Sequence, residues 1–173
     1  MGSTIPSALD VELARYRAAW HDHSGVIPVP LFPLMEEHGW TVRTDGGLRN
    51  LAAVSILDSR TQTRVMLVNE HYPPEWKHTA AAVLLVQHLR CGDGVRELWS
   101  GFSCAWGIRD IRADGLPVAR LLIPDEALDP RSTPDDLAAA CAVPAALAVL
   151  RLLGAGPAYR TAALSGTLWR EIR

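Results

Sequence analysis

The stretch KHTAAAVLLVQHLRCG, residues 77–92, predicts a buried helix in the core of the fold. An unbroken run of small and aliphatic residues, Ala80–Val86, lies between His78 and His88. The two histidines are ten residues apart, which is about 15 Å along a helix, whereas zinc binds its ligands at ~2.1 Å. One metal ion therefore cannot bind both, and no HExxH pair at i, i+4 spacing is present. As it stands, the stretch is a core helix.

The composition is that of a globular protein with one domain. The 173 residues are 49% hydrophobic and 21% charged. A net charge of −2 argues against a basic surface that binds the phosphate backbone of nucleic acid, so direct DNA binding is not expected. No apolar run reaches the length of a membrane span, and the N-terminal MGSTIPSALDVELARYR lacks the basic-then-apolar order of a signal peptide. We therefore expect a cytoplasmic protein without a membrane segment.

The N-terminal part of the chain predicts two helices followed by three strands. Residues 10–23 form an amphipathic pattern that Pro28 and Pro30 do not allow to continue. Pro33 suits the first turn of a short helix over 31–39. The strand-like runs, separated by turn residues, are residues 40–44, 51–58 and 63–69. These runs predict a small antiparallel meander packed on the core helix.

The C-terminal part predicts mainly helix. The core helix begins at Pro74 and ends at Gly92, and residues 95–108 are ambiguous, with features of strand and loop. Thr133 and Pro134 form a strong helix start, as N-cap and first helical residue. Further helical patterns cover residues 114–128, 136–154 with a turn at 142–144, and 161–172.

The predicted fold class is α+β. We expect three regions, which are an N-terminal helix at 1–25, an α+β core at 26–130 and a C-terminal helical subdomain at 131–173. The second helix of the C-terminal pair carries one charge, Arg151, among alanine, valine and leucine. A helix that reads a DNA groove needs polar side chains, so this helix is predicted to be buried.

Two groups of residues are candidate metal ligands. His88, Cys91 and Cys104 are of types that zinc accepts, but nothing in the sequence fixes their geometry. The favoured interpretation is a surface imidazole and two unrelated thiols. The three cysteines include no CxxC pair, so reduced and mostly buried thiols are expected. Similarly, the segment 21–23, His-Asp-His, is more readily a charged exposed tripeptide than a metal site.

The pair Glu70 and His71 follows the last predicted strand and is a candidate acid/base couple. A solvated turn explains the pair equally well. No GxSxG motif, phosphate-binding glycine loop or EF-hand pattern is present. The six tryptophans could anchor a protein interface, although filling of the core is the favoured interpretation for most of them.

Taken in order, these segments resemble the ImmA/IrrE family of zinc metallopeptidases. That family has a small sheet ending in an IxxN strand, then RFTxAHExGH, ExxANxFAxxLLxP and a helical pair xLAxxxxVSxxAxxxRLxxLG. The resemblance covers roughly residues 26–155, and its strength lies in the order and spacing of the segments. The matching segments are VMLVN (65–69), YPPEWKHT (72–79), RLLIPDEAL (120–128) and DLAAACAVPAALAVLRLLG (136–154). The resemblance implies a zincin-like fold with a central zinc helix.

The departures from the family pattern fall on its catalytic residues. When residues 77–79 are laid on RFT, the two metal-binding histidines of HExGH fall on Ala82 and Val86, and the general base falls on Val83. The third ligand of the family falls near Ala113, with Asp114 one residue away. Alkyl groups cannot hold zinc or move a proton. The core helix is therefore interpreted as a former zinc helix, with no cofactor expected.

Three functions follow from the resemblance. The first is a zinc-free pseudoenzyme that regulates transcription by binding an XRE-type helix-turn-helix regulator, the class of protein on which active members act. The second is a repurposed small-molecule enzyme, for example in a biosynthetic pathway, whose pocket is rimmed by Glu70, His71, His78 and Asp114. The third is a zinc peptidase with substitute ligands His78, His88, Cys91 and Cys104. We expect the first, and the orientation of His71 and His78 distinguishes it from the second.

Overall fold

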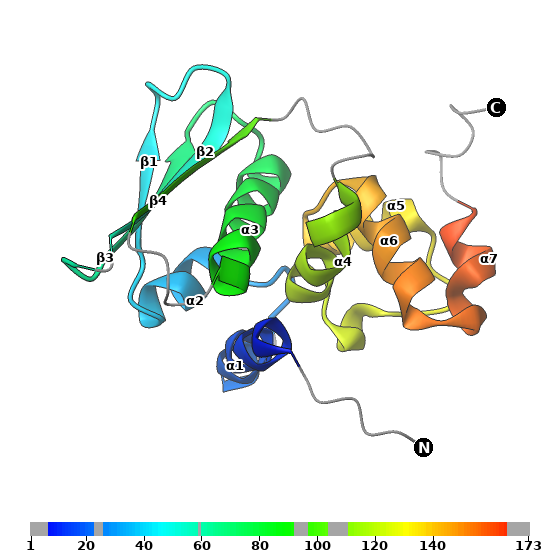
Figure 1. Ribbon diagram of the computed structural model, residues 1–173. Coiled ribbons are helices and arrows are strands. Elements are labelled where there is room, and N and C mark those ends of the chain that lie inside the picture. Colours follow the sequence, from blue (N-terminus) through cyan, green and yellow to red (C-terminus); the bar gives the residue numbers. More distant parts are fainter. Residues whose placement is uncertain (1–6, 23–25, 59, 92–96, 104–110, 166–173) are drawn as a thin grey trace.

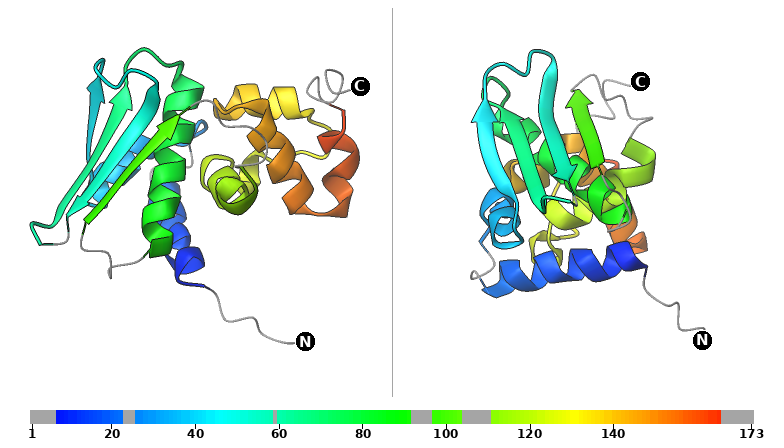
Figure 2. Two further views of the ribbon diagram at one scale, coloured as in Figure 1. Left: turned by 45° about the horizontal axis from the view of Figure 1, so that its top comes forward. Right: turned by 60° about the vertical axis from the view of Figure 1, so that its left-hand side comes forward.

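The computed structural model describes residues 7–22, 26–58, 60–91, 97–103 and 111–165. The fold is α+β, and α3 lies along one face of a mixed sheet with the C-terminal helices beyond it (Figures 1 and 2). The elements in chain order are α1 (Ala8–Asp22), α2 (Leu31–Glu37), β1 (Thr41–Asp45), β2 (Leu51–Asp58), β3 (Thr63–Asn69), α3 (Pro74–Cys91), β4 (Glu97–Ser103), α4 (Ile111–Leu122), the 3-10 turn η1 (Asp125–Ala127), α5 (Pro134–Cys141), α6 (Ala145–Ala155), η2 (Pro157–Tyr159) and α7 (Arg160–Ala163).

The helix boundaries follow from local chemistry. Thr133 caps α5 by accepting the Asp136 N–H, while the Asp136 carboxylate accepts the Thr133 N–H, and Pro134 takes the first helical position. This predicted helix start is confirmed. Gly39, with φ of 82°, follows the end of α2 in a left-handed conformation that favours glycine. A helix is predicted at 161–172. Within the described residues, the α-helix in this region is α7.

The three predicted strands form within one residue of their expected bounds, but their order differs from a meander. β2 and β3 form an antiparallel hairpin, whereas β1 pairs in parallel with β3. β4 adds antiparallel to the other edge of β2, so the sheet order is β1-β3-β2-β4. The prediction of an antiparallel meander is therefore wrong, because β3 lies between β1 and β2.

The connection between β1 and β2 explains this order. Residues 46–50 connect β1 to β2 across β3. The connection spans two strand spacings, about 10 Å. Five extended residues reach about 17 Å, so they are long enough to cross. Asn69, 1% exposed at the end of β3, holds the crossing in place. Its Nδ2 donates to the carbonyl oxygens of Arg49 and Leu51 at 3.2 and 2.9 Å, and its Oδ1 accepts the His71 N–H at 3.0 Å.

The core is centred on α3. Every residue from Thr79 to Val86 is buried, and the helix packs on β2, β3 and β4 on one side and on α4 on the other. α6 packs in turn on α4 and α5, and Leu147, Ala148 and Leu152 bury its inner face. In the part of the chain that the structure describes, no single helix is long and apolar enough to cross a membrane. α5 and α6 together have the length and apolar composition of a membrane span, but the two helices are bent by 112° relative to each other.

We predict that Asn69→Ala lowers the free energy of unfolding by about 3 kcal/mol, since three hydrogen bonds are lost at roughly 1 kcal/mol each. Asn50→Ala is the matched control, because Asn50 is exposed in the same connection. Its unfolding free energy should change by less than about 0.5 kcal/mol. Urea denaturation measures both variants. Equal losses would contradict the role of Asn69 in holding the crossing.

Candidate functional site

The predicted former zinc positions lie at the centre of the core. Ala82, Val83 and Val86 are all 0% exposed on α3. Ala82, Val86 and Arg90 are spaced by four residues and therefore follow one side of the helix. Arg90 is paired with α4, so this side of α3 faces α4. Hydrocarbon therefore fills the interface between α3 and α4 at these positions.

Asp114 lies at the edge of this interface. Its Oδ1 is 2.6 Å from Nη1 of Arg90, which is an ion-pair distance, although the geometry is not that of a hydrogen bond. Asp114 is in the first turn of α4, next to Ala113, and is 9% exposed. Since Arg90 is in the last turn of α3, two turns from Ala82, the carboxylate lies toward the end of α3. Asp114 is thus a partner of Arg90.

The predicted acid/base couple forms a solvated turn. His71 Nε2 is 3.6 Å from Glu70 Oε1, and the two side chains are 70% and 55% exposed. His78 is half-buried, and its ring centroid lies 4.7 Å from that of Phe32 on α2. Burial, followed by the charge of Lys77, lowers the pKa of His78. The second predicted function needs these histidines in one enclosed pocket, but His71 points into solvent.

His88 differs from its prediction as a surface imidazole. The side chain is 5% exposed, and Nε2 is hydrogen-bonded to Ser55 Oγ at 2.7 Å. Burial lowers the pKa of His88 to about 4, and the Arg64 charge contributes to the same shift. The prediction failed because the polar partner of His88 is on β2, 33 residues earlier in the chain. The ring is therefore neutral at neutral pH.

The substitute zinc ligands are only partly described. Cys91 is exposed, which differs from the predicted buried thiol, and Cys141 is buried. Burial raises the pKa of the Cys141 thiol to about 11. Cys104 lies outside the described residues. Within those residues, no three His, Cys, Asp or Glu side chains form a group that could hold a metal ion.

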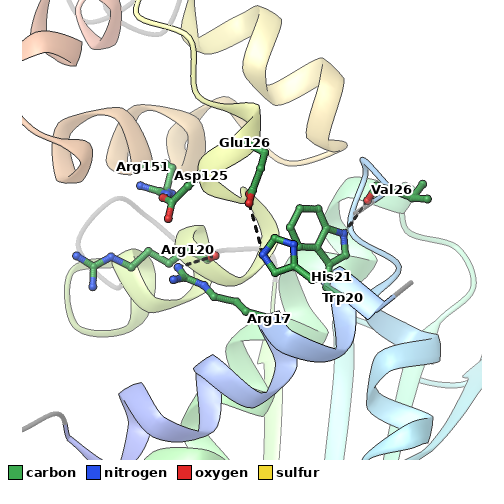
Figure 3. A network of polar contacts seen from close by, with 8 residues as sticks. All are labelled: Arg17, Trp20, His21, Val26, Arg120, Asp125, Glu126 and Arg151. Atoms are coloured by element: carbon green, nitrogen blue, oxygen red, sulfur yellow. Dashed lines mark hydrogen bonds and ion pairs between the residues drawn. The ribbon is translucent and has the colours of Figure 1, made fainter. Parts of the chain in front are cut away.

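His21 takes part in a polar network between α1 and the C-terminal half (Figure 3). Its Nε2 lies 3.4 Å from Glu126 Oε1, with both side chains more than half exposed. Arg17 Nη2 donates to the carbonyl oxygen of Arg120 at 3.3 Å. These contacts join α1 to the end of α4 and to η1, which is a structural role. His23, the second member of the predicted tripeptide, lies outside the described residues.

Arg151, the one charge predicted on the second helix of the C-terminal pair, is 3% exposed on α6. Its Nε donates to the carbonyl oxygen of Ile123 at 2.9 Å, and Nη2 donates to the Asp125 carboxylate. The buried cation thus joins α6 to the segment after α4 (Figure 3). The inner face of α6 is buried as predicted, whereas Leu153 on the same helix is 43% exposed. The charge of Arg151 serves the fold.

The tryptophans divide between core and partly exposed positions. Trp20 and Trp40 are 3% and 5% exposed, so they fill the core, and Trp76 is half-buried. Trp20 Nε1 donates to the Val26 carbonyl oxygen at 2.8 Å, which satisfies its polar group. Trp106 and Trp169 lie outside the described residues.

A cavity that sequence reasoning missed lies where α1 contacts the C-terminal part of α3. We call it the α1 pocket. Its volume is about 460 Å³, and its walls come from α1, the segment after α2, the β2–β3 hairpin and the end of α3. No sequence signal marks the pocket, because its residues come from four separate segments. The lining residues are Ala8, Glu12, Arg15, Tyr16, His38, Trp40, Leu57, Arg64, His88 and Leu89.

Comparison of the chain with known protein families, with characterised proteins and with solved structures finds no match. The resemblance to ImmA/IrrE metallopeptidases therefore stays a prediction. The α+β class and the elements described above rest on the structure alone.

We predict that His88 makes the protein less stable at acidic pH. Its pKa in the folded state, about 4, is below the ordinary value of 6.5, so the unfolded chain binds the proton first as pH falls. The stabilisation is fully present above about pH 6.5 and is lost as pH falls through 4, a loss of about 3 kcal/mol.

Urea denaturation across this pH range measures the effect. His88→Gln should flatten the difference between pH 7 and pH 4, whereas the exposed His71→Gln should leave the wild-type profile unchanged. A wild-type profile in His88→Gln would show that other groups cause the pH dependence.

Proposed function

We propose that this chain is a zinc-free relative of the ImmA/IrrE metallopeptidases that acts in the cytoplasm by binding a protein partner. The partner class is an XRE-type helix-turn-helix regulator, bound without being cut. The observation that carries the proposal is the full burial of Ala82, Val83 and Val86, the positions onto which the two metal-binding histidines and the general base of the family align. The family assignment and the partner class rest on the sequence resemblance.

The chemistry of these positions supports binding without hydrolysis. A catalytic zinc site needs three N, O or S ligands and an open position for water. Here the positions aligned with the two histidine ligands and with the general base carry methyl and isopropyl groups, and neighbouring Leu84 and Leu85 are also buried. Replacing polar side chains with packed hydrocarbon also removes the desolvation cost of buried polar groups. Such a helix favours stability over catalysis.

The outer face of the sheet offers a surface for a partner. Val54 pairs with Leu67 and Ile56 pairs with Val65 across β2 and β3. These four side chains alternate with buried Ala53, Ser55, Met66 and Val68, so they point away from α3. Each is partly exposed. Contiguous apolar side chains on a surface are typical of protein interaction sites.

A repurposed small-molecule enzyme in the former zinc cleft is the second candidate. It requires His71 or His78 to point into an enclosed pocket next to the aligned positions. His71 is 70% exposed, and His78 lies against Phe32. These positions favour the binding protein over this enzyme.

We predict a direct complex between the purified chain and a purified XRE-type regulator from the same genome. Val54→Thr/Leu67→Thr should weaken the complex by about tenfold or more, because two central apolar contacts are lost. Val11→Thr is the matched control, since Val11 is 44% exposed on α1 and should not affect binding. Isothermal titration calorimetry measures affinity, and mass spectrometry reports whether the regulator stays intact.

Three outcomes would contradict the proposal. They are no complex with any such regulator, cleavage of the regulator, or equal weakening by the double variant and by Val11→Thr. Circular dichroism verifies that both variants are folded.

A further inference from the structure

The α1 pocket has a buried inner end and a charged mouth. Tyr16, Trp40 and His88 are 2%, 5% and 5% exposed, and they form the inner end. Glu12 and Arg15 line the mouth from α1, with side chains that are 32% and 65% exposed. A volume of about 460 Å³ is in the range of small-molecule sites, roughly 300–1,000 Å³. The pocket is separate from the α3–α4 interface on which the proposed function rests.

The inner end contains an unsatisfied polar atom. His88 Nε2 is hydrogen-bonded to Ser55, but Nδ1 is buried and has no hydrogen-bond partner among the described residues. A buried polar atom without a partner costs free energy. The Trp40 ring, with its centroid 5.1 Å from that of His88, adds an aromatic wall. The inner end is therefore mainly aromatic, and among the described residues that line it His88 Nδ1 is the buried polar atom without a partner.

Arg64 supplies a positive charge to the pocket. It lies opposite Leu57 in the β2–β3 hairpin, and both residues line the pocket. Arg64 Nη1 donates to the carbonyl oxygen of His38 at 3.3 Å, and no ion pair joins Arg64 to a carboxylate of the described residues. The other arginine, Arg15, is already paired with Glu12 at 2.7 Å. Since burial keeps His88 neutral, Arg64 is, among the described residues that line the pocket, the cation without an ion pair.

We propose that the α1 pocket binds a small carboxylate with an aromatic or aliphatic body. The Arg64 guanidinium binds the carboxylate, the body lies against Trp40 and Leu57, and the His88 ring forms the polar contact at the inner end. A guanidinium binds a planar carboxylate through two charge-assisted hydrogen bonds, which a neutral amide cannot reproduce. This ligand class fits both the charge and the apolar walls.

The test uses 2-naphthoate as the probe and 2-naphthamide as its neutral counterpart of similar shape. The readout is the change in the ¹H and ¹⁵N shifts of the His88 side chain, assigned with His88→Gln. We expect naphthoate to bind at least about tenfold more tightly than naphthamide, because only naphthoate carries the charge that Arg64 pairs with. Equal affinities would overturn the carboxylate assignment, and an unchanged His88 spectrum with both probes would overturn the site.

Arg64→Gln separates recognition from folding. This variant should lose about tenfold in naphthoate affinity and keep its naphthamide affinity. The Arg64→Lys variant should recover part of the lost naphthoate affinity, because it restores the positive charge. Arg60→Gln is the matched control, because Arg60 is exposed near the same hairpin turn and does not line the pocket. Retained naphthamide binding shows that the pocket is intact in Arg64→Gln. Unchanged naphthoate affinity in that variant would overturn the role of Arg64.

Discussion

The arrangement of the fold centres on the middle of α3, which is buried on all sides. Eight consecutive residues, from Thr79 to Val86, are removed from solvent, so the helix needs the sheet on one side and α4 on the other. The one polar side chain in this run, Thr79, donates to the Glu75 carbonyl oxygen at 2.7 Å. A helix that is apolar all round is stable only inside a protein. The order of sheet, α3 and α4 follows from that requirement.

The same constraint determines where polar chemistry can occur. The middle of α3 has no room for an ionisable group. Two polar side chains near the C-terminal end of α3 have partners on other elements. There His88 bonds to Ser55 and Arg90 pairs with Asp114. The cavity that is lined by His88, with its unpaired Nδ1, and by Arg64 opens beside this end of the helix and is covered by α1. Any ligand chemistry of the described residues is therefore expected at the edge of the core, away from the aligned zinc positions.

Local signals in the sequence predict the elements well and their arrangement less well. Thr133 and Pro134 mark the start of α5 because capping depends on neighbouring residues alone. The strand pattern is likewise local, and β2 and β3 form at the predicted residues. The pairing of β1 with β3 is not local, since it depends on the contacts of Asn69 with the connection between β1 and β2. The prediction for His88 was wrong for the same reason. The sequence around His88 does not reveal that the distant Ser55 is its hydrogen-bond partner.

The zinc content of the purified protein tests the claim that α3 carries hydrocarbon where a zinc peptidase would carry its metal ligands. Protein purified without chelator, dialysed against zinc and then against metal-free buffer, is analysed for metal by elemental analysis. The buried positions Ala82, Val83 and Val86 lead us to expect far less than one zinc per chain. One zinc per chain, retained on dialysis and lost in His88→Ala or Cys91→Ala, would contradict the claim and identify substitute ligands.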